Sequence, residues 1–265
     1  MDLFEPYLHP VTQSNPHGIR LRSCALRTSK MGYNSTLRKH VGRDLMSAYT
    51  PDYLEAIEHL PDGAMLRLEH VSWDDYEQLL DQLAEWHGMR VSYDRGRVEI
   101  MSPSFQHEKF IAFISGMGRI LAEEMDLTVE AAGATTYKQE SLLKGSEGDE
   151  SFYVRSATAI IGKRQIDLDV DPPPDVVVEV DIINESLGRF PIYAAFLVPE
   201  IWRYDGKQAH IYHLVGECYL ERDASISFPV LTSTAMTEFL EQSKTQGQTP
   251  ALAAFRQWVR AANQA

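Results

Sequence analysis

The chain has 265 residues, of which 44% are hydrophobic and 24% are charged, as in an ordinary globular protein. Its net charge of −13 argues against strong nonspecific binding of nucleic acid, and no apolar run approaches the roughly 20 residues that span a bilayer. The N-terminus lacks the basic start and apolar core of a signal peptide. Cys24 and Cys218 have no spacing that suggests a disulfide framework or a zinc site. We therefore expect a reduced, soluble, cytoplasmic protein that does not associate with membranes.

Residues 1–45 differ in charge from the rest of the chain. Seven bases and three acids give this segment a charge of +4, which leaves −17 for the remainder of the total of −13. The segment also lacks apolar periodicity. We expect residues 1–48 to form an irregular basic extension and residues 49–265 to form a single domain. A basic arm that binds nucleic acid is the functional alternative for the extension.

The first half of the domain shows two helices, a hairpin and a third helix. Residues 50–60 predict a short helix with Pro51 in its first turn, and residues 72–86 predict a helix that Ser72 caps. Residues 89–102 alternate as a hairpin that turns at 94–96. Residues 104–125 have the apolar spacing of a helix.

Strands dominate the second half. Residues 127–140 predict a strand, followed by a polar loop over 144–150 and a short strand over 151–154. A helix is expected over 192–198, a strand pair that turns at 205–206, a strand over 218–223, and closing helices over 236–243 and 250–262. Interleaved helices and hairpins indicate a mixed α/β fold, in which a mixed central β-sheet is flanked by helices.

The stretch PPPDVVVEVDIINES, residues 172–186, has an unusual distribution of acids. Successive side chains of a strand point to opposite faces, so Asp175, Glu179 and Asp181 share one face with Val177. Carboxylates that are neighbours on one face repel each other and need open water or a cation. Two interpretations follow: the acids hold a divalent cation together with Asp149 and Glu99, or they are the solvated polar face of a half-exposed strand.

Other chemistry has less support in the sequence. His107 lies near the apolar stripe of its helix, where a buried histidine without a catalytic role is the alternative to a functional one. The aromatic residues of 198–206 are typical of core packing rather than of base stacking. The sequence has no glycine-rich phosphate loop, no nucleophile elbow and no pair of histidines with zinc-ligand spacing.

Five segments in this order resemble one family. They are RVEIMSPSFQHEKF (97–110), GDESFYV (148–154), PPDVVVEVDI (173–182), RFPIY (189–193) and VPEIWRYDG (198–206). The chain resembles, over about residues 66–235, the bacterial Uma-type restriction endonuclease family of the PD-(D/E)XK nuclease superfamily. The resemblance implies a restriction-endonuclease-like core and hydrolysis of phosphodiester bonds that depends on Mg²⁺ or Mn²⁺.

The resemblance also implies site residues. Asp149, Glu179 and Asp175 match the acidic positions of the family and would be the metal ligands, although Gly148 stands where the family usually has proline. Glu99 and His107 match a further block of the family. Asp181 stands where a catalytic lysine is expected, and the nearest match on the following helix is Arg189.

Arginine stays charged at any working pH, so Arg189 could not act as a general base but could stabilise charge on a phosphoryl group. We therefore expect a Mg²⁺-dependent endonuclease that acts on DNA rather than RNA. The alternative is a nuclease-fold module that does not cut and serves in binding or assembly. Cutting both strands of a duplex would favour a homodimer.

Overall fold

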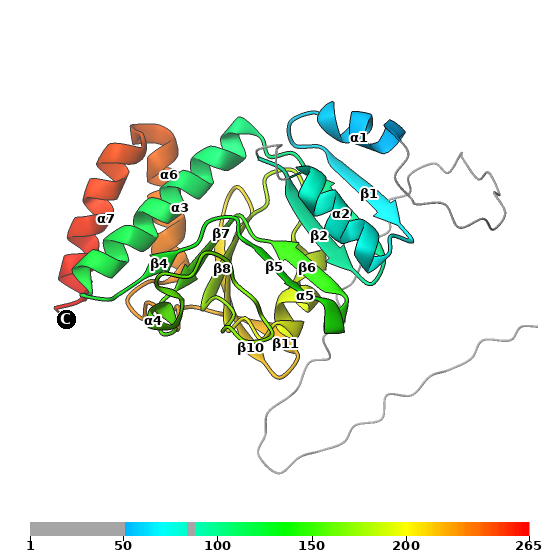
Figure 1. The fold of residues 1–265 in the computed structure, drawn as a ribbon. Coiled ribbons are helices and arrows are strands. Elements are labelled where there is room, and N and C mark those ends of the chain that lie inside the picture. The colour runs from blue at the N-terminus through cyan, green and yellow to red at the C-terminus, as the bar shows by residue number, and fades with distance from the viewer. Residues whose placement is uncertain (1–50, 84–87, 265) are drawn as a thin grey trace, which may run out of the picture. The chain divides into compact units, whose positions relative to one another are not determined.

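The computed structural model describes residues 51–83 and 88–264, so the expected N-terminal extension lies outside the described residues. The described chain forms two sheets with helices packed on their faces (Figure 1). One is an antiparallel sheet of five strands and the other is a mixed sheet of six strands. No helix within the described ranges is both long enough and apolar enough to span a membrane.

The antiparallel sheet has the strand order β1-β3-β2-β6-β5. Its strands are β1 (Met65–Glu69), β2 (Arg90–Asp94), β3 (Arg97–Met101), β5 (Thr136–Gln139) and β6 (Lys144–Glu147). One face packs Val98 and Ile100 against helices α1 (Pro51–Glu58) and α2 (Trp73–Leu83). The other face is polar, because Ser92 pairs with Glu99 on one side and with Ser146 on the other.

The mixed sheet has the order β11-β10-β9-β8-β7-β4, in which β8 and β9 are parallel and the other pairs are antiparallel. Its strands are β4 (Glu130–Ala131), β7 (Glu150–Tyr153), β8 (Val176–Val180), β9 (Glu200–Tyr204), β10 (Ala209–Val215) and β11 (Cys218–Arg222). The mixed central sheet flanked by helices that the sequence predicts is therefore confirmed.

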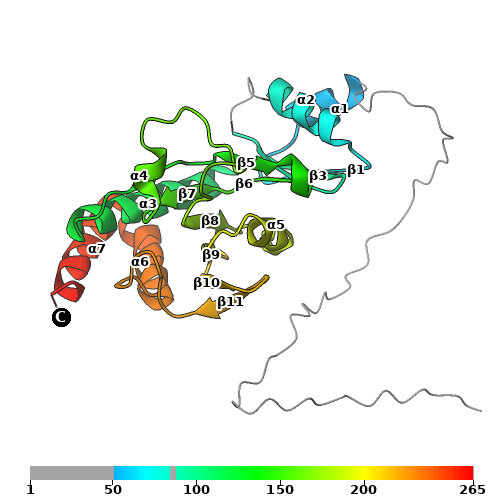
Figure 2. The same cartoon turned by 60° about the horizontal axis from the view of Figure 1, so that its bottom comes forward.

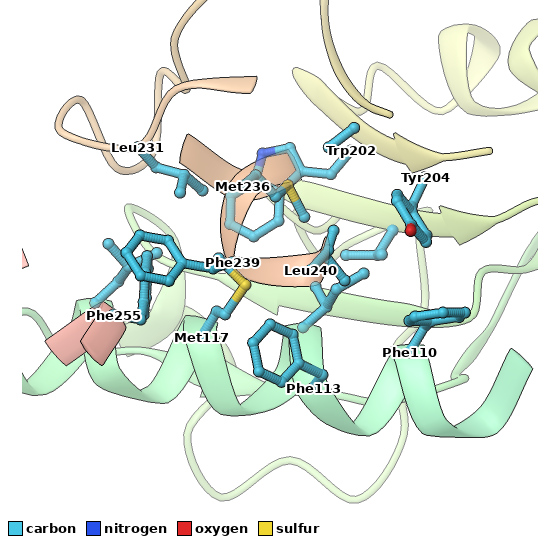
Figure 3. Packing of buried hydrophobic residues seen from close by; sticks show 14 of the residues in the cluster. Phe110, Phe113, Met117, Trp202, Tyr204, Leu231, Met236, Phe239, Leu240 and Phe255 are labelled. Carbon is cyan, nitrogen blue, oxygen red and sulfur yellow. The ribbon is translucent and has the colours of Figure 1, made fainter. Parts of the chain in front are cut away.

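The largest core cluster lies on one face of β8. Val176, Val178 and Val180 point to that face, where α3 (Phe105–Glu124), α6 (Ser233–Gln246) and α7 (Gln248–Ala262) pack together (Figure 1). Figure 3 shows how Phe113 and Met117 of α3 meet residues of the sheet and of the closing helices. This cluster fixes α3 against the mixed sheet.

A second core cluster covers the opposite face of β8. Val177 packs there with α4 (Ala157–Ile160) and α5 (Phe190–Ala195), so β8 is buried on both faces. Figure 2 shows α5 and α6 on opposite sides of the strands β8 to β10. A short 3₁₀ helix, Leu187–Arg189, leads directly into α5, and another spans Glu140–Leu142. Glu179 shares the face of Val177, as the alternation of the sequence predicts.

Two predictions for the strands are wrong. Residues 127–140 form not one strand but two short ones in different sheets, with Gly133 at a positive φ of 59° between them. Residues 144–147 form strand β6 rather than a loop. Their polar side chains concealed the strand, since Lys144 and Ser146 are buried by pairing with Asp94 and Tyr193. The other predicted helices and hairpins are present, most with shifted ends, and the last three residues of the helix predicted over 72–86 lie outside the described residues.

Candidate active site

Asp149 lies at the junction of the two sheets. Strand β6 continues through Gly148 and Asp149 into β7, so a single run of chain passes from the antiparallel to the mixed sheet. The amide of Asp149 donates to the carbonyl of Val178 at 2.9 Å, and the amide of Val180 donates to Oδ2 of Asp149 at 2.7 Å. These bonds hold a carboxyl that is only 2% exposed beside the end of β8.

Helix α3 brings His107 to this carboxyl. Ser104 caps the helix by accepting a hydrogen bond from the amide of His107 at 3.3 Å. Nε2 of His107 lies 3.0 Å from Oδ2 of Asp149. Burial by itself raises the pKa of Asp149, but the hydrogen bond and charge of His107, with the charge of Arg189, hold that pKa below its usual value.

Three buried polar atoms around Asp149 lack a hydrogen-bond partner among the described residues. They are Nδ1 of His107, Oδ1 of Asp149 and Nε of Arg90. The last two lie 3.5 Å apart, which is close enough for an ion pair but not for an aligned hydrogen bond. Unpartnered buried groups are uncommon and often mark functional sites.

Glu179 is fully buried and is held from two directions. Arg189 donates from Nε to Oε1 at 3.0 Å and from its terminal nitrogen to Oε2, and the hydroxyl of Tyr193 donates to Oε1 at 2.5 Å. Burial raises the pKa of Glu179, Arg189 opposes that rise, and Asp149 and Asp181 add to it. Burial lowers the pKa of Arg189, but the Glu179 charge more than offsets this and leaves it above its ordinary value.

The other two acids of the 172–186 stretch bind groups of their own. Asp181 accepts hydrogen bonds from the amide and hydroxyl of Ser186 and pairs with Arg203. Asp175, at the opposite end of β8, accepts from the amides of Val154 and Ser156 at 2.8 and 3.0 Å and lies 3.3 Å from Arg155. Asp175 therefore fixes the turn after β7. The hydrogen bonds and the ion pair of its side chain are with residues 154–156 and not with the groups around Asp149.

Glu99 also binds residues outside this cluster. It lies on the polar face of the antiparallel sheet, where Arg67 of the neighbouring strand donates to it at 3.0 and 2.6 Å. Arg97 lies 3.9 Å away on the same strand. These contacts are those of a cross-strand ion pair.

The interpretation of the acids as a solvated strand face is wrong. Asp175, Glu179 and Asp181 are at most 6% exposed. Each has an arginine beside it, and the same is true of Asp149. The pairs are Asp149 with Arg90, Asp175 with Arg155, Glu179 with Arg189, and Asp181 with Arg203. Guanidinium groups thus supply the positive charge that the repelling acids require.

Sequence reasoning missed Arg90, Arg203 and Tyr193. The two arginines come from β2 and β9, so only the folded sheets bring them to the acids. Tyr193 could have been found, because it follows Arg189 by four residues and therefore lies on the same side of the helix one turn later.

A small pocket lies beside the cluster. Its lining includes Ser104, the N-cap of α3, with His107 of α3, Val180 of β8 and Arg189. Asn184 and Gly63 also line it, and Asn184 donates to the carbonyl of Gly63 at 2.8 Å, which ties the loop after β8 to the segment before β1. Arg189 and His107 therefore border the same pocket.

As arranged here, the residues do not fit the Mg²⁺ or Mn²⁺ that the resemblance implies. Oδ1 of Asp149 has no hydrogen-bond partner but lies 3.5 Å from Nε of Arg90. Both oxygens of Glu179 accept from Arg189, and Asp175 binds a different turn. Within the described part of the chain, no group of three or more acidic, histidine or cysteine side chains could hold a metal ion. Mg²⁺ demands near-octahedral oxygen coordination, which this arrangement does not offer.

Comparisons with known proteins give one family match and one similar solved structure. The model of the Uma2 family, described as "Putative restriction endonuclease", matches residues 73–241. A solved structure described as a "putative nuclease belonging to DUF820 from Anabaena variabilis ATCC 29413" is similar in fold, with a TM-score of 0.42 and 13% sequence identity. That similarity covers 61% of this chain and 98% of the other. A search of curated proteins gives no match.

Proposed function

Because the chain belongs to the Uma2 family of restriction-endonuclease-like proteins, we propose that it is a nuclease that hydrolyses phosphodiester bonds of DNA. The observation that carries this proposal is the buried cluster at the meeting point of β7 and β8. There Asp149 and Glu179, which match the two acidic positions of the nuclease pattern, lie with His107 and Arg189 beside a pocket.

The hydrogen bonds of His107 support a role for it as general base. In the tautomer whose Nε2 hydrogen is donated to the carboxylate of Asp149, Nδ1 carries no proton. Nδ1 has no hydrogen-bond partner and so could take a proton from a water molecule that attacks phosphorus.

Arg189 supports the electrostatic part of the reaction. It lines the same pocket, and only two of its N–H donors have recorded contacts with Glu179. The remaining donors could bind the oxygens of a phosphate and stabilise the charge that develops on them. Glu179 and Tyr193 would orient the guanidinium for that contact.

Cleavage of labelled substrates tests the proposal. Single-stranded DNA, duplex DNA and RNA of one sequence are incubated with the protein in Mg²⁺, in Mn²⁺ and in chelator. We expect cleavage of DNA, and a rate at least 100-fold lower for His107→Gln, the size typical of losing a general base.

Glu179→Gln should lower the rate by a similar factor, because the guanidinium loses its orienting charge. Glu200→Gln is the matched control. Glu200 is also a fully buried carboxylate, but it binds Trp202 and the loop amides of Ile226 and Ser227. Its variant should cleave at the wild-type rate. If the wild type cuts none of these substrates, the alternative of a nuclease-fold module that binds without cutting replaces the proposal.

A further inference from the structure

We propose that Phe105 stacks on an unpaired base of a nucleic acid strand and that Lys109 binds a phosphate of the same strand. This inference rests on the proposed function for the kind of polymer, and it narrows the substrate to single strands or unpaired ends. A base inside a duplex is already paired and stacked, so it has no free face for the ring. Phe105 and Lys109 would bind the strand without taking part in the chemical step.

Phe105 is exposed although it is a large aromatic residue. It is the first residue of α3 and is 78% exposed, whereas Phe110 of the same helix is 6% exposed and packs in the core (Figure 3). An exposed ring gains little from burial, so packing within the domain does not explain a phenylalanine at this position. Surface aromatic rings of proteins that bind single strands stack on bases of any sequence, because every base has a flat face.

The position of Phe105 links two pockets. Ser104 and His107 line the small pocket of the candidate active site, whereas Gln106 and Lys109 line a second pocket with a volume of about 240 Å³. We call the second one the lysine pocket, and its described lining is Gln106, Lys109, Phe110, Ser243, Lys244 and Gln248. Residues four apart lie on the same side of a helix, so the exposed side chains of Phe105 and Lys109 form one edge. A strand bound in both pockets would pass over this edge.

The lysine pocket is positively charged in a chain whose net charge is −13. Its described lining holds Lys109 and Lys244 but no acidic residue. The amine of Lys109 lies 5.7 Å from the centre of the Phe105 ring, and within the described ranges no acidic side chain forms an ion pair with it. Glu108, the acid in the first turn of α3, pairs with Arg90 at 3.3 Å, so a base already compensates its charge. Lysine binds phosphate as a point charge, so the charge of Lys109 is available to a phosphate beside the ring.

The second lysine of the pocket is held in place. Lys244 pairs with Glu241 and donates to the carbonyl of Gly206 at 2.8 Å. Its amine also lies 5.7 Å from the ring centre of Phe110 and 5.6 Å from that of Tyr204. Because these contacts already occupy the amine, we expect Lys109 rather than Lys244 to make the direct phosphate contact.

Binding of fluorescent oligonucleotides to the full-length chain tests the inference. Fluorescence anisotropy is measured in chelator, so that cleavage does not consume the probes. The probes are an oligothymidylate, a strand of the same length built from abasic nucleotides, and a duplex that contains the oligothymidylate. The abasic strand keeps the phosphates but lacks the bases, and the duplex hides the bases.

Truncation of the ring should weaken the binding of one probe alone. Phe105→Ala should raise the Kd of the oligothymidylate at least about fivefold, the lower end of the loss when a stacking ring is removed. It should leave the Kd of the abasic strand and of the duplex unchanged. Phe105→Trp keeps a stacking surface and should bind as the wild type does. Val170→Ala is the matched control, because Val170 is also 78% exposed but lies in the loop before β8.

Salt dependence separates the ring from the lysine. The logarithm of the affinity falls with the logarithm of the salt concentration, with a slope of about 0.7 for each phosphate contact of a single strand. Lys109→Gln should therefore weaken the binding of all three probes and reduce the slope for the oligothymidylate by about 0.7. Phe105→Ala should keep the wild-type slope, because stacking does not neutralise a phosphate.

The outcomes separate this inference from the proposed function. The expected effects of Phe105→Ala and Lys109→Gln on binding, without cleavage of DNA by the wild type, would support the inference and contradict the nuclease. Cleavage of DNA together with an unchanged Kd of Phe105→Ala for the oligothymidylate would overturn the stacking and leave the nuclease standing. Equal losses of Phe105→Ala on all three probes would also overturn it, because the residue would then act through the fold or the phosphates. A wild type that binds none of the probes would overturn it as well.

Discussion

Burial and neighbouring charges have opposite effects on the pKa of Asp149. Its carboxyl is 2% exposed, yet the bonds from His107 and Val180 and the charge of Arg189 lower its pKa. A group whose pKa is lower in the folded than in the unfolded chain stabilises the fold above its unfolded pKa. That contribution is lost as the pH falls through the folded pKa.

We therefore expect Asp149→Asn to be less sensitive to acid than the wild type. The free energy of unfolding, measured by urea denaturation between pH 5 and pH 2.5, should fall by less in the variant because it lacks this ionisable group. Asp62→Asn, which changes an exposed aspartate, should follow the wild type. Equal losses in wild type and Asp149→Asn would show that the Asp149 contacts do not favour its charged form.

The acids and their partners differ in how far the sequence reveals them. Strand alternation places Glu179 on the face of Val177, and the structure confirms that arrangement. The resemblance also singles out His107, whose contact with Asp149 joins residues 42 positions apart. The arginines could not be assigned in this way. Arg90 and Arg203 reach their acids only through the pairing of β2 with β6 and of β8 with β9.

At the scale of elements, α3 links the core to the pocket. Its apolar residues follow helical spacing, which is why the sequence predicts the helix closely. Strand β6 shows the opposite case, because its sequence KGSE carries no apolar alternation. Lys144 and Ser146 of this strand donate hydrogen bonds to Asp94 and Tyr193, which belong to other elements. The local sequence pattern does not contain that information.

The N-cap of α3 should affect both stability and activity. Ser104→Ala removes the hydroxyl that accepts from the amide of His107 and should lower the free energy of unfolding by about 1 kcal/mol. Because the same turn positions His107 beside Asp149, the cleavage rate should fall as well. Thr232→Ala removes the equivalent cap of α6, where the hydroxyl accepts from Ala235 at 3.1 Å.

Urea denaturation and cleavage assays of the two variants separate the effects. Both should lose similar stability, but only Ser104→Ala should cleave more slowly under conditions where each variant is fully folded. A Ser104→Ala variant with wild-type cleavage would mean that His107 keeps its position without the cap.

At the scale of the whole described domain, the two sheets are joined by the run from β6 to β7. Gly148 lies at the crossing, where an added Cβ would come 2.7 Å from Cγ1 of Val177. The crossing sets Asp149 against β8, so the packing that joins the sheets also builds the candidate site. The resemblance shows only that glycine replaces the usual proline. Only the fold shows that Gly148 lies close to Val177 and that a side chain at position 148 would therefore collide with it.

Gly148→Ala should therefore destabilise the domain by about 1–3 kcal/mol, the usual range for overpacking a core. Val177→Ala alone should cost roughly 2 kcal/mol, since Val177 is fully buried. In the double variant the new methyl group occupies part of the space that Val177 leaves, so the loss should be smaller than the sum of the two single losses by at least 0.5 kcal/mol. Urea denaturation of the wild type, the two single variants and the double variant measures this difference from additivity. Strictly additive losses would mean that β7 and β8 separate to admit the methyl group. Asp149 would then move away from β8, and Gly148→Ala should also cleave DNA more slowly.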